Sequence, residues 1–262
     1  MKIYADYDEE PREEFLALPA ALYRQLYDLE LHDFSDDFPF YQEHLPPCSE
    51  ILELGCGSGR LTRLLTNAGH CITGIDLSPP MLLAAQTRAP GSRLVCMDMR
   101  KIAFRTTFAA IIIPYNTLNL LADNDDVVRC LTCCREHLQP EGQLLIQLYI
   151  PNTNPSPEDS TSFQFQIFDR PEGGRVVKET LRTFHPATTT ITMEERYKIR
   201  PMNGVEPNCN YKHTMTLNAN SRETWLNIIN SAGFTITSAS SSYTPTSPTA
   251  PTLLLIKAST PL

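Results

Sequence analysis

Three glycines stand two residues apart in the segment Glu53-Leu54-Gly55-Cys56-Gly57-Ser58-Gly59, between a short apolar run and a helical pattern. Glycine lets the backbone turn tightly and approach a ligand without a Cβ in the way. The helix that follows offers unpaired N–H groups at its N-terminus. A dinucleotide-binding turn would place its third glycine three residues after the second. Because Gly57 and Gly59 are only two apart, the turn predicts a ligand loop of a different kind.

Two carboxylates follow the next two predicted strands. Asp76 ends the run 71–76, and Asp98 comes just after the run 92–96. Asp76 could accept hydrogen bonds from two ribose hydroxyls, or it could cap the helix that begins near Pro79. Asp98 could accept a hydrogen bond from an adenine amino group, or it could stabilise a turn. Because ligands bind at the carboxyl ends of such strands, the two carboxylates and the glycine turn together predict a nucleoside site.

Alternating patterns of strand and helix position these residues. Strand-like runs occupy 50–54, 71–76, 92–96, 108–113 and 142–149, and helical patterns occupy 60–68, 81–88 and 123–138. Five strands alternating with helices are typical of a doubly wound α/β sheet. Two further helices are predicted ahead of this core, at 12–31 and 38–45, where apolar residues recur at helical spacing.

The pattern changes after residue 151. A Pro/Ser-rich connection at 152–162 leads to four strand-like segments, at 163–169, 175–184, 189–200 and 211–217. Gly173-Gly174 is typical of a hairpin turn, so this part is predicted as an antiparallel insertion. A helix at 221–232 and strands at 234–240 and 252–258 then complete the chain. The predicted division is 1–47 helical, 48–151 α/β core, 152–218 β insertion and 219–262 the C-terminal part of the core sheet.

The net charge of −8 over 262 residues is unevenly distributed. Residues 1–45 hold twelve acidic and three basic residues, whereas the rest of the chain holds 18 acidic and 19 basic residues. A nucleic-acid partner is disfavoured because such partners need a basic face. No run of about 18 apolar residues could span a membrane, and the N-terminus lacks the apolar core of a signal peptide. We therefore expect a cytoplasmic protein.

Three of the eight cysteines, Cys130, Cys133 and Cys134, share one predicted helix. Their spacing places them on one helical face, which invites comparison with a metal site. No second pair of ligands has matching spacing, so we predict buried packing and no metal.

These motifs resemble those of the class I S-adenosylmethionine-dependent methyltransferases, particularly a bacterial group that acts on small molecules. The likeness covers about residues 26–151 and is weaker from there to the end. The segments that carry it are Tyr27-Asp28-Leu29-Glu30, Asp36–Tyr41, Ile51–Arg60, Gly74–Ser78 with Met81-Leu82, Asp98-Met99-Arg100, Ile113–Leu118, His137–Gly142 and Ala232-Gly233-Phe234. Glu141 stands where glycine is commoner in that family.

The resemblance implies a seven-stranded sheet of order 3-2-1-4-5-7-6, with strand seven antiparallel, and an N-terminal lid formed by residues 1–47. It also implies binding of S-adenosylmethionine, with S-adenosylhomocysteine as the product. The cofactor-binding residues that it implies are Tyr27, Glu53, Gly55, Cys56, Gly57, Gly59, Asp76, Leu77, Ser78, Met81, Asp98, Met99, Pro114, Tyr115 and Asn116.

Particular roles within this set also come from the resemblance. Gly55, Cys56 and Gly57 would pass along the methionine part, and Glu53 would help to orient its amino group. Asp76 would hold the ribose hydroxyls, and Asp98 would accept a hydrogen bond from the adenine amino group. Leu77 and Met99 would pack on the two faces of adenine. The sulfonium would be faced by Pro114, Tyr115 and Asn116, and Tyr27 would close the lid on the cofactor.

The implied reaction is an in-line displacement in which a lone pair of a small-molecule acceptor attacks the methyl group. The protein supplies mainly alignment and desolvation, and a base is needed only where the acceptor is protonated. The candidate bases are His32, His185, His213, Tyr27 and Tyr115, and the catalytic residue stays unknown. One hypothesis is that the acidic lid favours a cationic or amine acceptor, whereas the simpler alternative is solvated surface charge.

Other readings of the fold stay open at this stage. The chain could bind the cofactor in a regulatory role, or catalyse a different reaction such as a cyclisation. A nicotinamide-dependent oxidoreductase is disfavoured by the glycine spacing and by Asp98. A homodimer is compatible with the sequence.

Overall fold

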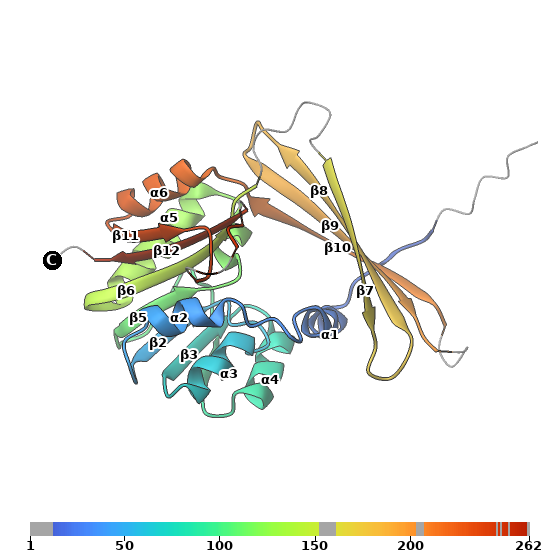
Figure 1. Cartoon of the computed structure of the whole chain (residues 1–262), viewed down its shortest axis with the longest axis horizontal. Coiled ribbons are helices and arrows are strands. Elements are labelled where there is room, and N and C mark those ends of the chain that lie inside the picture. Colours follow the sequence, from blue (N-terminus) through green and yellow to red (C-terminus); the bar gives the residue numbers. More distant parts are fainter. Residues whose placement is uncertain are drawn as a thin grey trace, which may run out of the picture.

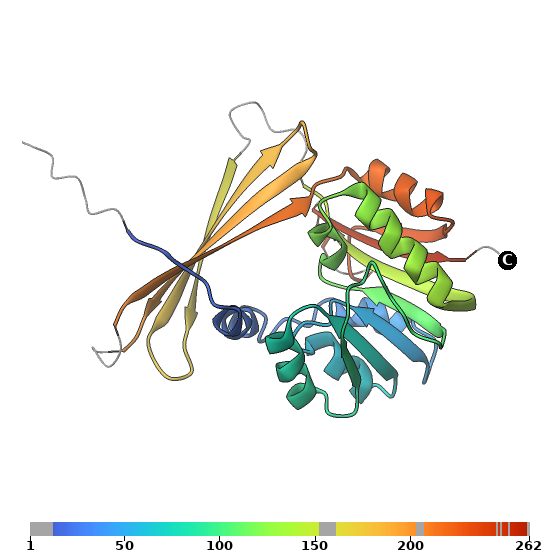
Figure 2. The same ribbon diagram turned by 180° about the vertical axis from the view of Figure 1, so that it is seen from behind.

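Two β-sheets organise the chain, and helix α1 (Ala20–Glu30) lies between them in both views of the ribbon (Figure 1, Figure 2). The computed structural model describes residues 13–151, 161–202, 207–244, 246, 248–250 and 252–260. The larger sheet and its helices form one body, and the smaller sheet stands on the far side of α1.

The larger sheet has seven strands in the order β11-β12-β6-β5-β2-β3-β4. These strands are β2 (Glu50–Leu54), β3 (Cys71–Asp76), β4 (Arg93–Cys96), β5 (Phe108–Ile113), β6 (Leu138–Tyr149), β11 (Thr235–Ser240) and β12 (Leu253–Ser259). β12 runs antiparallel to both of its neighbours, and the β2–β6 block is parallel. The predicted order 3-2-1-4-5-7-6 with an antiparallel seventh strand is confirmed.

Helices cover both faces of this sheet. They are α2 (Phe38–His44), α3 (Arg60–Asn67), α4 (Pro79–Arg88), α5 (Asn124–His137) and α6 (Arg222–Ser231), with a short 3-10 helix η1 (Thr117–Leu120). α5 and α6 pack on one face around Trp225, while α2 and α3 pack on the other around Tyr41. Strand β5 is apolar along its whole length because both of its faces are buried. Asp123 caps α5, because its side chain accepts a hydrogen bond from the Asp125 N–H.

Two predicted boundaries are wrong. Helix α1 begins at Ala20 rather than near residue 12, because Pro19 occupies its N-cap and Leu16–Ala17 form a short strand, β1, parallel to β10. Strand β6 begins at Leu138, four residues earlier than predicted. It starts early because Leu138 pairs with Phe108, and Glu141, with φ at 61°, lies where the register shifts.

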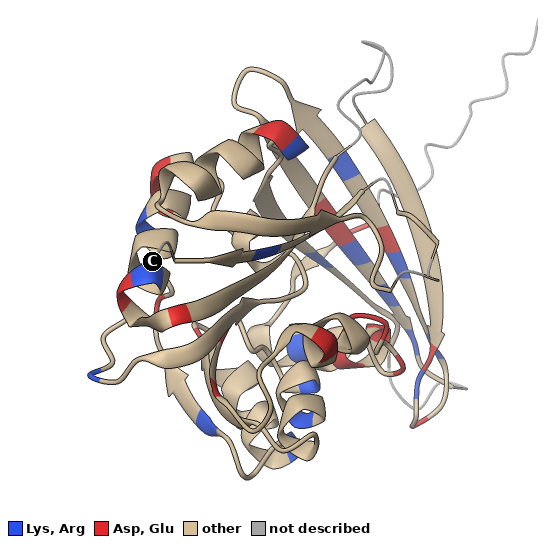
Figure 3. Cartoon of the chain, turned by 60° about the vertical axis from the view of Figure 1, so that its left-hand side comes forward, with Lys and Arg blue, Asp and Glu red and all other residues tan. Residues whose placement is uncertain are grey.

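The smaller sheet has the order β1-β10-β9-β8-β7. Its long strands are β7 (Thr161–Asp169), β8 (Arg175–His185), β9 (Thr190–Arg200) and β10 (Cys209–Asn218). Each of these four strands runs antiparallel to the next. The hairpin turn predicted at Gly173-Gly174 is confirmed, since both residues have positive φ. Most of the predicted 152–162 connection lies outside the described residues. Figure 3 shows acidic and basic residues side by side on these strands.

Among the described residues, no helix is long and apolar enough to cross a membrane.

A buried ion pair fastens the segment after α1 to the core. Asp37 is fully buried, and its two oxygens accept hydrogen bonds from Arg60 at 2.8 and 2.6 Å. Arg60 is the first residue of α3, and its guanidinium lies 4.9 Å from the centre of the Phe34 ring. The N-terminal segment is therefore tied to the helix that follows the glycine turn.

We expect Arg60→Met to lower the free energy of unfolding by about 3–5 kcal/mol, because it leaves the buried Asp37 carboxylate without its partner. The matched control is Arg93→Met, which breaks an exposed pair with Glu50 at 3.4 Å and should cost no more than about 1 kcal/mol. Urea unfolding followed by circular dichroism measures both. Equal losses in the two variants would contradict the role given to Arg60.

Candidate active site

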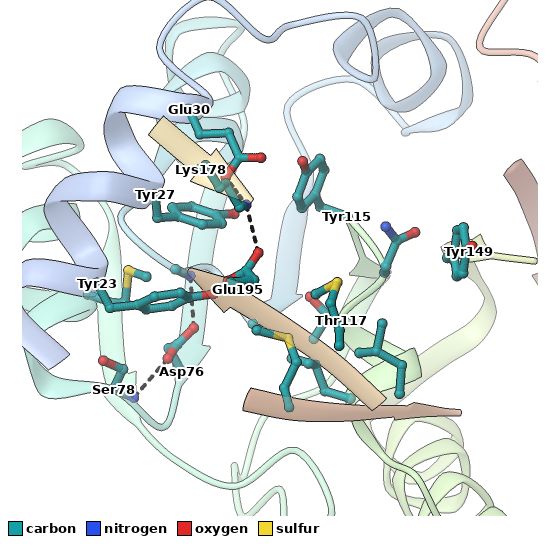
Figure 4. A pocket seen from close by; sticks show the side chains of 18 of the residues that line it. Tyr23, Tyr27, Glu30, Asp76, Ser78, Tyr115, Thr117, Tyr149, Lys178 and Glu195 are labelled. Carbon is teal, nitrogen blue, oxygen red and sulfur yellow. Dashed lines mark hydrogen bonds and ion pairs between the residues drawn. The ribbon is translucent and has the colours of Figure 1, made fainter. Parts of the chain in front are cut away.

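Two cavities meet where the carboxyl ends of β2, β3 and β5 come together. The first, of about 320 Å³, lies between α1, the glycine turn and the smaller sheet, and Figure 4 shows its side chains. The second, of about 400 Å³, follows the ends of β3 and β4. The linings of the two cavities share Gly55, Asp76, Thr117 and Leu120.

The glycines of the predicted ligand turn have two different uses. Gly55 and Gly57, with φ at 67° and 53°, line the first cavity. A Cβ on Gly55 would lie 2.7 Å from Thr117 Oγ1, so the turn has no room for a side chain there. Gly59, with φ at 80°, instead allows close packing of α3 on α4, since a Cβ would lie 2.9 Å from Ala85 Cα. Positive φ at these positions favours glycine.

Cys56 lies within the same turn but faces away from both cavities. It is buried, and its side chain packs where a Cβ on Gly74 would lie, 2.9 Å from its Sγ atom. Burial raises the pKa of the Cys56 thiol, so the thiol is neutral at physiological pH. Cys56 therefore takes part in the turn through its backbone and not through its sulfur.

Asp76 fixes the turn from the neighbouring strand. Its Oδ2 accepts a hydrogen bond from the Gly57 N–H at 2.9 Å, and its Oδ1 accepts one from the Ser78 N–H at 2.8 Å (Figure 4). The N-cap of α4 has no side-chain hydrogen bond, so Asp76 does not act as the cap of that helix. Ser78 and Met81 line the first cavity beside it.

The second cavity is lined by apolar residues and by the carboxylate of Asp98, which Arg100 holds in place. Leu77 and Met99 line it, and Leu77 is 63% exposed. Asp98 also lines it, with Oδ2 2.6 Å from the Arg100 guanidinium and Oδ1 accepting from the Arg100 backbone N–H at 2.9 Å. Hydrogen bonds from Arg100 lower the pKa of Asp98, so the carboxylate is ionised at neutral pH. Asp98 thus stabilises a turn and also lines the cavity.

Aromatic rings form the wall of the first cavity next to the glycine turn. The Tyr27 ring from α1 meets the Tyr115 ring edge to face, with centroids 6.3 Å apart, and Tyr23 lies one helical turn away (Figure 4). Tyr115 and Asn116 have φ at 47° and 63° and both line this cavity. Residues other than glycine rarely adopt this left-handed backbone conformation, and those that do concentrate at functional sites. Pro114, just before them, lines neither cavity.

The histidines predicted as candidate bases line neither cavity. His213 is the nearest, because its ring packs edge to face on Tyr23 at 4.8 Å and it pairs across the strands with Glu195. The His213 Nε2 atom is buried without a hydrogen-bond partner. His185 Nε2 lies 2.8 Å from Thr192 Oγ1 on an exposed part of β8, and the His32 side chain is 81% exposed.

Several lining residues were missed by the sequence analysis. Glu30, Lys178, Arg182, Glu195 and Tyr149 all line the first cavity. A sequence signal exists for those on β8 and β9, namely Lys178, Arg182 and Glu195, because these charged residues occupy strand positions that should face the core side of the sheet. Figure 4 shows Lys178 between the carboxylates of Glu30 and Glu195.

Half of the eight acidic residues that the structure describes in the N-terminal segment form ion pairs with Lys or Arg, namely Glu13, Asp28, Glu30 and Asp37. Asp28 contacts Arg24 and Arg88 at 2.9 and 3.0 Å and accepts a hydrogen bond from Ser58. Glu30 contacts Lys178. Of the acidic residues described in this segment, Glu30 alone lines the first cavity. Its first four acidic residues, Asp6, Asp8, Glu9 and Glu10, lie outside the described residues.

The three clustered cysteines pack as predicted. Cys130 and Cys134 are buried in the core, and the Cys133 Sγ atom lies 3.3 Å from the Arg100 carbonyl oxygen. Within the described ranges, no group of three or more His, Cys, Asp or Glu residues could hold a metal ion.

Glu53 is buried beneath the glycine turn and lines neither cavity. It is 1% exposed, and its Oε2 accepts a hydrogen bond from the Thr62 hydroxyl at 2.6 Å. Burial raises the pKa of Glu53 to about 7, because the charged form loses its hydration.

We expect this raised pKa to make the protein less stable as pH rises. Between about pH 4.5 and 7 the unfolded chain has lost the Glu53 proton while the folded chain still holds it, so stability falls through this window and is level above it. The loss has an upper limit of roughly 3 kcal/mol, since one pKa unit is about 1.4 kcal/mol. Urea unfolding from pH 4.5 to 8 should show a smaller decline for Glu53→Gln than for the wild type. Parallel curves would contradict the assignment.

Comparison with known proteins identifies the domain that carries these cavities. Residues 51–142 match the sequence profile of a family described as "Methyltransferase domain". A putative methyltransferase of Bacillus subtilis, YqeM, is 37% identical over 109 residues, which is 40% of this chain and 44% of that protein. The chain therefore matches less than half of this relative's length.

Two other proteins extend the likeness. The dTDP-3-amino-3,4,6-trideoxy-alpha-D-glucopyranose N,N-dimethyltransferase of Streptomyces venezuelae is 26% identical over 46% of this chain and 50% of its own. The solved structure of CalS10 with S-adenosylmethionine, an amino pentose methyltransferase from Micromonospora echinaspora, has a TM-score of 0.72 at 20% identity, covering 95% of this chain and 100% of that one. The fold is thus shared along almost the whole chain, and residues 51–142 match the methyltransferase-domain profile.

Proposed function

We propose that this protein transfers a methyl group from S-adenosylmethionine to a small-molecule acceptor, with amines favoured over oxygen nucleophiles. The observation that carries the proposal is the junction of the two cavities at Gly55 and Asp76. The second cavity suits a nucleoside, and the first leads from the same point toward α1 and the smaller sheet. A transfer reaction needs this arrangement because donor and acceptor atoms must meet in line.

The side chains around the junction fit the cofactor by their chemistry. Each Asp76 oxygen accepts one backbone hydrogen bond, which leaves acceptor capacity for ribose hydroxyls. Leu77 and Met99 offer apolar surface to the adenine ring, and Gly57 leaves room for the chain between nucleoside and sulfur, since a Cβ there would lie no nearer than 3.9 Å to Tyr27. When bound, S-adenosylmethionine supplies a methyl group on a positively charged sulfur.

The tyrosines next to the turn exclude water and stabilise positive charge rather than act as bases. Burial raises the pKa of Tyr115 to about 12 and raises that of Tyr27 further. Both hydroxyls therefore keep their protons at neutral pH and cannot accept another group's proton as phenolates. Their ring faces suit a cation, because an aromatic quadrupole attracts positive charge.

The preference for amines rests on the carboxylates of the first cavity and on one relative. Glu30 and Glu195 both line this cavity. The name of the Streptomyces venezuelae relative gives dimethylation of an amino sugar as that protein's reaction. An amino sugar or another small amine is accordingly the acceptor class that we propose for this chain.

Gly55→Ala should lower the affinity for S-adenosylhomocysteine at least tenfold, because the new methyl group would meet Thr117 and φ of 67° strains any residue with a Cβ. Gly91→Ala is the matched control, since its Cβ would make ordinary contact with Thr66 at 3.7 Å. Isothermal titration calorimetry measures both. Unchanged affinity in a folded Gly55→Ala variant would contradict the assigned path of the cofactor.

The reaction itself is tested by methyl transfer from labelled S-adenosylmethionine to matched panels of amines, phenols and carboxylic acids. We expect cofactor binding without binding of nicotinamide nucleotides, and transfer mainly to amines. A clear preference for carboxylic acids would overturn the acceptor class. Cofactor binding without transfer to any acceptor in a metabolite extract would favour the regulatory role or a different reaction.

A further inference from the structure

Three charged side chains from three separate elements meet on the wall of the first cavity (Figure 4). Glu30 ends α1, Lys178 lies on β8 and Glu195 lies on β9. The Lys178 Nζ atom is 2.6 Å from Glu30 Oε2 and 2.6 Å from Glu195 Oε1. The side chains are only 20%, 6% and 5% exposed for Glu30, Lys178 and Glu195, so this group, here called the charged triad, is largely removed from water.

The charged triad has one more carboxylate than it has cations. Glu195 Oε2 accepts a hydrogen bond from the neutral Tyr197 hydroxyl at 3.1 Å, which adds no positive charge. Arg182 also lines the cavity, but its guanidinium donates to Gln164 at 3.3 Å on the neighbouring strand. A charge held away from water is costly unless it is paired. The excess carboxylate is therefore an electrostatic reason for this cavity to take up a cation.

The position of Lys178 argues against an anionic ligand at the same place. Its ammonium is already held by two carboxylates and lies 5.6 Å from the centre of the Tyr197 ring. An incoming anion would have to displace one of these carboxylates and would then face its charge. Lys178 instead keeps Glu30 and Glu195 close together by offsetting their mutual repulsion.

The aromatic wall strengthens the same preference. Tyr23 and Tyr27 come from α1, the helix that carries Glu30, and line the cavity together with Tyr115, whose ring meets that of Tyr27 edge to face. Desolvation raises the pKa of Tyr23, so its hydroxyl is neutral and its ring remains available to a cation. Carboxylates and aromatic faces together are a chemistry that recognises ammonium groups.

We propose that Glu30 and Glu195 form the acceptor-binding subsite and select acceptors that carry a protonated amine, with Lys178 balancing one of the two carboxylate charges. Before transfer the ammonium gives its proton to one of these carboxylates, which frees the lone pair that attacks the methyl group. This inference rests on the proposed function and names the residues responsible for acceptor choice. It also gives the insertion a direct role, because two members of the charged triad lie on β8 and β9.

The test titrates the full chain, saturated with S-adenosylhomocysteine, with three ligands that share one ring: cyclohexylamine, cyclohexanol and cyclohexanecarboxylate. The wild type should bind the amine at least tenfold more tightly than the alcohol, and the carboxylate most weakly. Glu30→Gln and Glu195→Gln should each remove most of that preference. Glu194→Gln is the matched control, because Glu194 is the neighbour of Glu195 on β9, pairs with Arg196 and does not line this cavity.

Lys178→Met separates this account from recognition of an anion. Removing the ammonium leaves two carboxylates for a ligand cation, so the amine should bind at least as tightly as in the wild type and should raise the melting temperature of the variant. Loss of amine binding in a folded Lys178→Met variant, or a wild-type preference for the carboxylate, would overturn the proposal.

The affinity for S-adenosylhomocysteine keeps the two proposals distinguishable. It should stay within about twofold of the wild type in Glu30→Gln, Glu195→Gln and Glu194→Gln. If the wild type did not bind S-adenosylhomocysteine, the proposed function would fail, and the amine titration without it would still test the subsite. An amine preference that survives both Glu30→Gln and Glu195→Gln would overturn the subsite alone.

Discussion

The carboxylate of Asp76 holds the turn on which the rest of the site depends. By accepting the Gly57 and Ser78 N–H groups, it joins the ends of β2 and β3 and sets the path of the backbone between them. The turn needs left-handed residues at three glycines: Gly55 lies at the junction of the two cavities, Gly57 lines the first cavity, and Gly59 lets α3 pack on α4. A bulkier or differently hydrogen-bonded turn would close that junction.

The second constraint is the attachment of α1. Asp28 and Asp37, on either side of the end of this helix, pair with Arg88 and Arg60 of the core. This attachment brings Tyr27 over the glycine turn and places Glu30 against the smaller sheet. Half of the acidic residues described in the N-terminal segment form specific pairs, and the charge of the described part reaches the first cavity at Glu30.

The residues that we assign to the cofactor could be named from the sequence because the motifs that carry them are local. The glycine turn, Asp76 and Asp98 each follow a strand that the apolar pattern identifies, and the sheet order follows from the family resemblance. Gly59 shows the limit of this reasoning, since the same residue type can serve helix packing. The early start of β6 was also not predicted from the sequence, because it depends on pairing of Leu138 across the sheet, next to Glu141 with its left-handed backbone.

The acceptor half could not be predicted, because its residues meet only in the folded chain. Glu30 is more than a hundred residues away from Lys178 and Glu195 in the sequence, and no motif joins the three. Their alternating positions in β8 and β9 indicate a shared face but not what that face covers. His213 was singled out by type, yet it lies behind Tyr23 and outside the cavity lining.

The central claim is that one ligand occupies each cavity and that the two ligands meet at Gly55. The most direct measurement is a crystal structure of the protein with S-adenosylhomocysteine and a small amine. The account predicts the adenosyl group between Asp76 and Asp98, the sulfur facing Tyr115, and the ammonium beside Glu30 and Glu195. An adenosyl group bound elsewhere, or an amine bound away from these carboxylates, would contradict it.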